Sequence, residues 1–293
     1  MINYNSKAWL ANIFMMKRSD TLRQLAPKII AVCIYTGAII YAETTFMHLP
    51  ENSPVKHFGI LQTLLSFVIS MLLVFRTNTA YDRWWEGRKL WGALVNNSRN
   101  LAVKMNAMLP RANAKDRAFF IKLIPMFAVA LQQHLQAEKT RLELDTEPHP
   151  EIPDFDQSKH VPNQIASLML TKVNLLYKDG VITGDQLITL NGELQSFLDI
   201  CGACERIKNT PIPYSYSVFI KKFIFVYTLT LPIGMVFTLH YLLIPVVALV
   251  FYVLASLEMI AEEIEDPFGT DENDLPMQKM SENIRKNIED ILR

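Results

Sequence analysis

The chain has 293 residues, half of them hydrophobic, and its 29 lysines and arginines balance its 29 aspartates and glutamates. This length allows one large domain or two ordinary ones, and the balanced charge argues against a nucleic-acid partner, which usually shows as a basic excess. The hydrophobic residues are gathered in long uncharged runs, so the sequence predicts an integral membrane protein.

The first segment, residues 1–27, is predicted to be cytoplasmic. Its stretch "AWLANIFMM" is short and is interrupted by Asn12, so it does not resemble a cleavable signal peptide. Trp9, Leu10, Ile13 and Phe14 recur at helical spacing, which favours a helix lying in the membrane interface.

Residues 28–80 are predicted to hold two membrane-spanning helices. The first begins near Ile29 and continues past Glu43 to Pro50, and a buried helix of a soluble core is the alternative for it. The second contains the run 58–75, which has no charged residue and is about as long as one membrane crossing.

The second span carries one ordered column of large side chains. Phe67, Met71 and Phe75 recur every four residues, and Ser66 and Ser70 lie about 100° away round the helix. If several copies met around an axis, the large residues would line a hydrophobic constriction, while the small polar face would pack against a neighbouring helix.

Residues 81–215 are predicted to form a helical cytoplasmic domain without strands. The run "FFIKLIPMFAVALQQHL" has the i, i+3, i+4 pattern of a core helix. Thr183 and Gln186 form a capping-box pattern, and the helix they open is expected to end near Lys208, before "TPIP".

The same domain shows no sequence sign of enzyme chemistry. We find no phosphate-binding loop, no nucleophile elbow and no His/carboxylate motif at metal-ligand spacing, so each of the six histidines is interpreted as a surface or packing residue. Cys201 and Cys204 form "CGAC", which lacks the second pair of a zinc site and is interpreted as helix packing.

Residues 216–262 are predicted to hold the third and fourth spans. The uncharged run 223–257 is too long for one crossing, so it is expected to form a hairpin of two spans, broken near Pro232, His240 and Pro245. Lysines and arginines are concentrated before the first span, after the second and before the third, which places both termini and the middle domain in the cytoplasm. Residues 263–293 complete the chain as an acidic loop and a C-terminal helix.

Two long motifs resemble one family. "FRTNTAYDRWWEGRKLWG" at 75–92 and "EIEDPFGTDENDLP" at 263–276 are similar to segments of the bestrophins, including their bacterial homologues. The resemblance implies an all-α membrane protein, with four transmembrane helices and a helical cytoplasmic domain, that forms a homopentamer around a central pore. In that family the second span lines a hydrophobic neck above a cytosolic vestibule with a second constriction.

The resemblance also assigns pore positions. The neck falls on Phe67, Met71 and Phe75. The family usually has a mixture of phenylalanine and isoleucine at these positions, and the methionine at the middle position suggests a softer constriction. The cytosolic aperture falls near Asp185, although a slip of one residue would place Gly184 or Gln186 there. The alternative for Asp185 is an ordinary acid favoured in the first turn by the helix dipole.

A calcium site is the second implied feature. The acidic ligands of the calcium-gated animal members map onto Glu263, Asp266, Asp271 and Asp274, and such carboxylate-rich sites suit calcium. The alternative is that these acids are solvated or pair with basic residues of the junction after the second span. No other cofactor is expected.

The sequence therefore predicts a passive channel for small monovalent ions, with the membrane lipid, the permeant ions and further copies of the chain as its partners. The acid at position 185 and the absence of a basic ring in the neck favour cations, whereas the animal members are chloride channels. A secondary transporter and a membrane scaffold without a pore are the alternatives. The expected location is the bacterial inner membrane, and the tryptophans at 84, 85 and 91 are expected to pack the pore helix within or between subunits.

Overall fold

The computed structural model describes residues 21–47, 58–136, 151, 155–156 and 158–293, and its regular elements in these ranges are helices. The interfacial helix expected at "AWLANIFMM" therefore lies outside the described residues. The chain divides into two compact units, of which the first comprises residues 1–83, 211–266 and 271–273, and the second residues 84–210, 267–270 and 274–293. The long middle segment of the second unit thus begins three residues after, and ends five residues before, the predicted cytoplasmic domain of residues 81–215.

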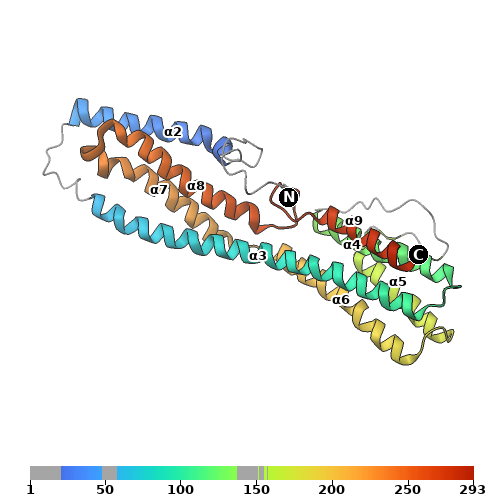
Figure 1. Ribbon diagram of the computed structural model, residues 1–293. Coiled ribbons are helices and arrows are strands. Elements are labelled where there is room, and N and C mark those ends of the chain that lie inside the picture. The colour runs from blue at the N-terminus through green and yellow to red at the C-terminus, as the bar shows by residue number, and fades with distance from the viewer. Residues whose placement is uncertain (1–20, 48–57, 137–150, 152–154, 157) are drawn as a thin grey trace. The chain divides into compact units, whose positions relative to one another are not determined.

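The first unit is a bundle of apolar helices. It contains α2 (Thr21–Ala42), which continues into the π-helical turn η1 (Glu43–Met47), the first part of α3 (Phe58–Met108), α7 (Tyr214–Leu239), the 3-10 turn η3 (His240–Leu242) and α8 (Leu243–Glu265). Figure 1 shows α2, α7 and α8 packed side by side. Their core includes Ile40 of α2, Ile69 and Leu73 of α3, and Val247 of α8.

The chain turns between α7 and α8 at His240, the middle of the three residues near which the break was expected. His240 has a φ of 43°, a backbone conformation that residues other than glycine rarely adopt, and α7 ends immediately before it. Pro232 lies inside α7, and Pro245 lies within the first turn of α8. The sequence correctly predicted a helical hairpin, and the bend lies at His240 rather than at either proline.

Four stretches of the described chain are long and apolar enough to cross a membrane: Thr21–Phe46, Phe58–Met108, Ala114–Gln136 and Tyr214–Glu265. The last contains both α7 and α8. The third, which is α4, differs from the rest because 61% of its apolar window is buried within the chain, against 17% to 28% for the others. A helix covered on most sides by its own unit is a core helix, so α4 belongs to the core of the second unit, as its sequence pattern predicted.

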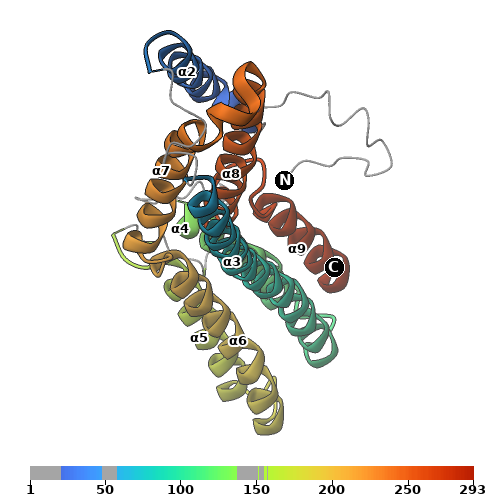
Figure 2. The ribbon, with the colours of Figure 1, turned by 90° about the vertical axis from the view of Figure 1, so that its left-hand side faces the viewer.

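The second unit is formed by the remainder of α3 together with α4 (Ala114–Gln136), α5 (Val161–Lys178), α6 (Gly184–Asn209) and α9 (Met277–Leu292). Helix α4 packs against α5, α6 and α9, and α5 runs beside α6, as Figure 2 also shows. The rings of Phe127 and Phe197 meet edge to face, with their centroids 5.0 Å apart. Thr183 and Gln186 form the predicted capping box, and α6 ends at Asn209, one residue beyond the expected end.

Candidate pore helix and its cytoplasmic junction

The predicted neck residues share one exposed side of α3. Phe67, Met71 and Phe75 are 71%, 50% and 52% exposed, whereas Ile69 and Leu73 are 1% and 2% exposed in the core of the first unit. Each neck residue is two positions from one of these buried residues, and two positions correspond to about 200° round a helix. The column Phe67, Met71 and Phe75, called the neck column below, therefore lies opposite the side by which α3 packs on its own unit.

The serines beside the neck column bond within α3, and Ser66 also has a side-chain partner on a neighbouring helix. The Ser66 hydroxyl donates to the carbonyl of Thr63, and that of Ser70 donates to the carbonyl of Ser66, both at 2.7 Å. Bonds of this kind stay within one helix. The Ser66 side chain also hydrogen-bonds the Tyr227 side chain of α7, so this small polar face contacts a neighbouring helix at Ser66.

A close approach that the sequence did not suggest is made by glycines. A Cβ atom on Gly234 of α7 would lie 2.9 Å from the Gln62 side-chain oxygen and 3.2 Å from the backbone nitrogen of Gly59. Gln62 is itself buried, with 4% of its surface exposed. The two glycines thus allow α3 and α7 to meet, in the way that small residues do in membrane helices. Their sequence positions carry no spacing motif that would have identified the pair.

Arg76 follows the neck column directly and is buried. It is 1% exposed, and its Nη2 atom lies 2.7 Å from a carboxylate oxygen of Glu265, at the end of α8. Its Nε atom lies 3.6 Å from the carboxylate of Glu258, which is also buried. A buried guanidinium requires such partners, because leaving its charge unpaired would cost several kcal/mol. The ion pair therefore ties α3, directly after the neck column, to the end of α8.

Glu265 is the centre of this junction. Its carboxylate also accepts the backbone amide of Ile212 at 2.7 Å, and its carbonyl accepts Arg83 Nε at 3.0 Å. It thus joins α3, α8 and the chain entering α7. The alternative interpretation of the acidic segment, that its acids pair with arginines of the junction, is correct for this residue, although Glu265 was not among the four predicted ligands.

Those four acids are placed as follows. The carboxylate of Glu263 accepts the Asn273 side-chain amide at 2.8 Å. Asp266 ends α8 as its C-cap, and Asp271 lies in the turn beyond it. Asp274 is 3% exposed, and its carboxylate lies so close to Gly269 that a Cβ atom there would be 2.7 Å away. Among the described residues, one group of three His, Cys, Asp or Glu side chains has its ligand atoms within 4.8 Å of one another. That group contains none of these four acids. Calcium binding by these four acids stays a prediction from the resemblance.

The two sequence motifs meet within the second unit as well. A Cβ atom on Gly87, at the centre of "WWEGRK", would lie 3.1 Å from the Phe268 ring and 3.2 Å from Pro267. Phe268 is fully buried. Trp91 is fully buried in the same core, Trp84 is partly buried against it, and Trp85 is 46% exposed while stacking on Trp84. Packing within the unit thus holds two of the three tryptophans.

Asp185 is exposed in the first turn of α6. Its position at a cytosolic aperture stays a prediction. Sequence reasoning did not draw attention to Ile188, which lies three residues later and therefore on the same face of the helix. Ile188 is 72% exposed, unlike most isoleucines. The exposed start of α6 thus presents an acid and an aliphatic side chain together.

The cysteines of "CGAC" are structural in character. Cys201 and Cys204 are buried, and burial raises the pKa of Cys201 to about 12 and the pKa of Cys204 further. A thiol that stays protonated is a poor nucleophile and a poor metal ligand. Sequence spacing did not reveal one polar cluster in this region. His134, His160 and the neighbouring Glu205 converge on one another, although nothing in their sequence spacing indicates it.

Comparison with known proteins gives the same family as the two motifs at 75–92 and 263–276. Residues 1–290 match the family model described as Bacterial/Fungal Bestrophin protein. The chain belongs to the bestrophin family.

Relatives of the bestrophin chain are similar over most of their length. A voltage-dependent anion channel-forming protein of Nostoc sp. is 32% identical over 97% of this chain and 92% of its own, and YneE of Escherichia coli K12, which bears the same description, is 31% identical over 94% and 89%. A crystal structure of a bacterial bestrophin homologue from Klebsiella pneumoniae superimposes with a TM-score of 0.80 at 24% identity, over 92% of this chain and 99% of its own. These comparisons confirm the predicted family, the helical membrane-protein fold and the expectation that the chain is not an enzyme.

Proposed function

We propose that this bestrophin is a subunit of a homopentameric channel that conducts small monovalent ions passively. The observation that carries the proposal is the neck column, an ordered apolar face of α3 that points away from its own unit. A ring of such faces would form a hydrophobic constriction able to gate ions by dewetting. The names of the curated relatives, which are described as channel-forming, support the same conclusion.

The continuity of α3 is a second support. With 51 residues it is about 75 Å long, more than twice the thickness of the hydrocarbon core of a bilayer. A pore helix of this length extends well beyond the membrane, and the ion pair of Arg76 with Glu265 is suited to keep its lower end in register with α8. We propose that both termini face the cytoplasm and that the protein lies in the bacterial inner membrane, as the distribution of lysine and arginine predicts.

For selectivity we propose a preference for cations. A ring of Asp185 carboxylates at the cytosolic aperture would attract cations, with Ile188 as the adjoining aliphatic element. The relatives named above are described as anion channel-forming, and an anion-selective channel is the competing proposal. The two differ in the sign of one measurable voltage.

That voltage is the reversal potential of purified protein in a planar bilayer under a gradient of potassium chloride. Cation preference predicts a reversal potential near the potassium equilibrium potential, which Asp185→Asn shifts toward zero, whereas Glu193→Asn on the same helix leaves it unchanged. A reversal potential near the chloride value would refute the cation proposal. Flux that saturates at low turnover would indicate a transporter, and the absence of any current would favour a scaffold without a pore.

Calcium binding by Glu263, Asp266, Asp271 and Asp274 stays a prediction from the resemblance. Four carboxylates within twelve residues supply the right chemistry, but one chain does not bring three of them within ligand distance. The conduction proposed above does not require bound calcium. Calorimetric titration of the purified channel, with Asp271→Ala for comparison, tests it: heat of binding that the variant abolishes would establish the site, and no heat would remove it.

A further inference from the structure

Three polar side chains of the second unit, all outside the proposed pore sites, come together from three helices. His134 lies near the end of α4, His160 is the N-cap residue of α5, and Glu205 lies near the end of α6. The Nε2 atoms of His134 and His160 lie 2.6 Å and 2.5 Å from the same carboxylate oxygen of Glu205. The two imidazole rings are 4.4 Å apart between centroids. Two imidazoles and a carboxylate thus point at one small volume.

We propose that His134, His160 and Glu205 bind a divalent transition-metal ion, with zinc as the ion that fits best. Zinc takes imidazole nitrogen and carboxylate oxygen as ligands, in a tetrahedral arrangement at about 2.0 to 2.2 Å. Neither calcium nor magnesium fits a donor set with two nitrogens, because both ions prefer oxygen ligands. Three protein ligands leave a fourth position for water or another ligand.

The distances from Glu205 to the two imidazoles are shorter than those between two ligands of one zinc ion. Ligand atoms around a tetrahedral zinc ion are about 3.3 Å apart, so each imidazole must move about 0.7 Å from the Glu205 oxygen to admit the ion. The three side chains are between 27% and 30% exposed, which leaves them free to make this small adjustment. Hydrogen bonds between the histidines and the carboxylate hold the same groups together until the ion arrives.

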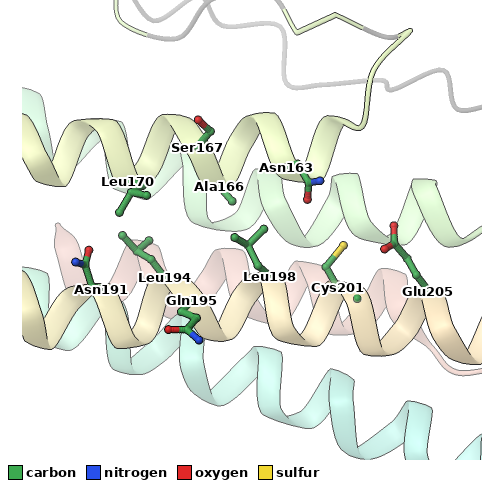
Figure 3. Close-up of a pocket in the computed structure, with 11 residues that line it drawn as sticks. Asn163, Ala166, Ser167, Leu170, Asn191, Leu194, Gln195, Leu198, Cys201 and Glu205 are labelled. Carbon is green, nitrogen blue, oxygen red and sulfur yellow. The ribbon is translucent and has the colours of Figure 1, made fainter.

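The ion has an open route to these ligands. Glu205 lines a groove of about 700 Å³ between α5 and α6, which is shown in Figure 3 with the Glu205 carboxylate directed toward the N-terminal end of α5. His160 lines an adjoining hollow of about 500 Å³, and Asn163 and Ser167 line both. The nearby ammonium of Lys208 donates to the backbone carbonyl of His134 at 3.2 Å.

Binding has a definite cost at His160. Its Nδ1 atom accepts the backbone amide of Asn163 at 3.2 Å and so caps α5, which leaves the ring proton on Nε2. Coordination through Nε2 requires the proton to be on Nδ1, and the cap bond is then lost. This cost favours a transition-metal ion that imidazole suits, such as zinc or copper. Once bound, the ion would cross-link α4, α5 and α6.

The test uses full-length protein in detergent, freed of any histidine tag and stripped with EDTA. Zinc is titrated against a chromophoric chelator, and the expected result is one zinc ion per chain, with two imidazole ligands in its X-ray absorption spectrum. His160→Asn is the sharpest variant, because asparagine preserves an N-cap acceptor while removing the imidazole. His134→Gln and Glu205→Gln complete the set, and His240→Asn is the control because asparagine tolerates a positive φ.

We expect each of the three cluster variants to weaken zinc binding at least tenfold, since even groups that only support a ligand contribute tenfold to a hundredfold. The control should bind zinc as the unmodified chain does. Binding that is equal in all four variants would place the zinc elsewhere and overturn the proposal. A chain that takes up no zinc at 100 µM free ion would overturn it as well, and the cluster would then be a hydrogen-bonded contact between helices.

Discussion

Replacing Arg76 by methionine tests the junction below the neck column. The change keeps a long side chain and removes the buried charge that faces Glu265 at 2.7 Å and Glu258 at 3.6 Å. Removing one partner of a buried ion pair leaves the other charge uncompensated and typically costs about 3 to 5 kcal/mol. We expect a loss of this size in the free energy of unfolding.

The corresponding change in melting temperature follows from chain length. The unfolding entropy of about 2.1 cal/mol/K per residue amounts to about 0.6 kcal/mol/K for 293 residues. Arg76→Met should therefore lower the melting temperature by about 5 to 8 °C, measured by tryptophan fluorescence of protein in one detergent at one concentration. Glu265→Gln, which removes the partner charge, should destabilise the protein in the same direction.

Lys221→Met is the matched control. Lys221 of α7 pairs with Glu262 of α8 at 2.7 Å, but the two side chains are 46% and 56% exposed. Exposed pairs contribute less than about 1 kcal/mol, so this variant should lower the melting temperature by less than about 2 °C. If Arg76→Met and Lys221→Met had equal effects, or if Arg76→Met were neutral, the junction would not have the role assigned to it.

Three further predictions concern packing and chemistry elsewhere. Gly87→Val should cost about 1 to 3 kcal/mol, because the added carbons enter space held by Phe268 and Pro267; an unchanged melting temperature would contradict this contact. Thr183→Ala should cost about 1 kcal/mol by removing the cap of α6, and Thr189→Ala on the same helix is the control in the same thermal assay. Iodoacetamide at pH 8 should modify Cys201 and Cys204 far more slowly in folded than in denatured protein, because burial raises the pKa of both thiols; equal rates by mass spectrometry would show that the thiols are accessible.

The raised pKa of Cys201 also has a consequence for stability against pH. The folded chain keeps the thiol proton to about pH 12, whereas the unfolded chain releases it near the ordinary value of 9.0. Between these values the folded state binds more protons, so the contribution of Cys201 to stability is complete below pH 9 and is lost as pH rises through this window.

Local patterns predicted the helices well because the signals that form them are local. The four-residue column on the second span identified the exposed side of α3, and the Thr183 capping box together with "TPIP" gave both ends of α6 to within one residue. The 3.6-residue period likewise assigned α4 to the core, even though its composition alone would allow a membrane span.

Contacts between distant segments could not be predicted in this way. Arg76 and Glu265 meet because α3 packs near α8, and no periodicity shows which acid an arginine will find. Glu205 lies 45 residues from His160 and 71 from His134 in sequence, and they meet because α4, α5 and α6 pack together. The close approach of Gly59 and Gly234 could not be predicted for the same reason. The helices could therefore largely be predicted from the sequence, whereas the ion pairs and hydrogen bonds between distant segments could not.

The central claim is that the neck column lines an ion pore, and single-channel recording of Met71→Ala tests it most directly. Met71 is half exposed on the face of α3 that points away from its unit, and Met235, partly buried in α7, supplies a control of the same chemistry. We predict that Met71→Ala raises single-channel conductance or open probability, because it widens a hydrophobic constriction, while Met235→Ala leaves both unchanged. Equal currents from the unmodified chain and both variants would contradict the account, because another face would then line the pore.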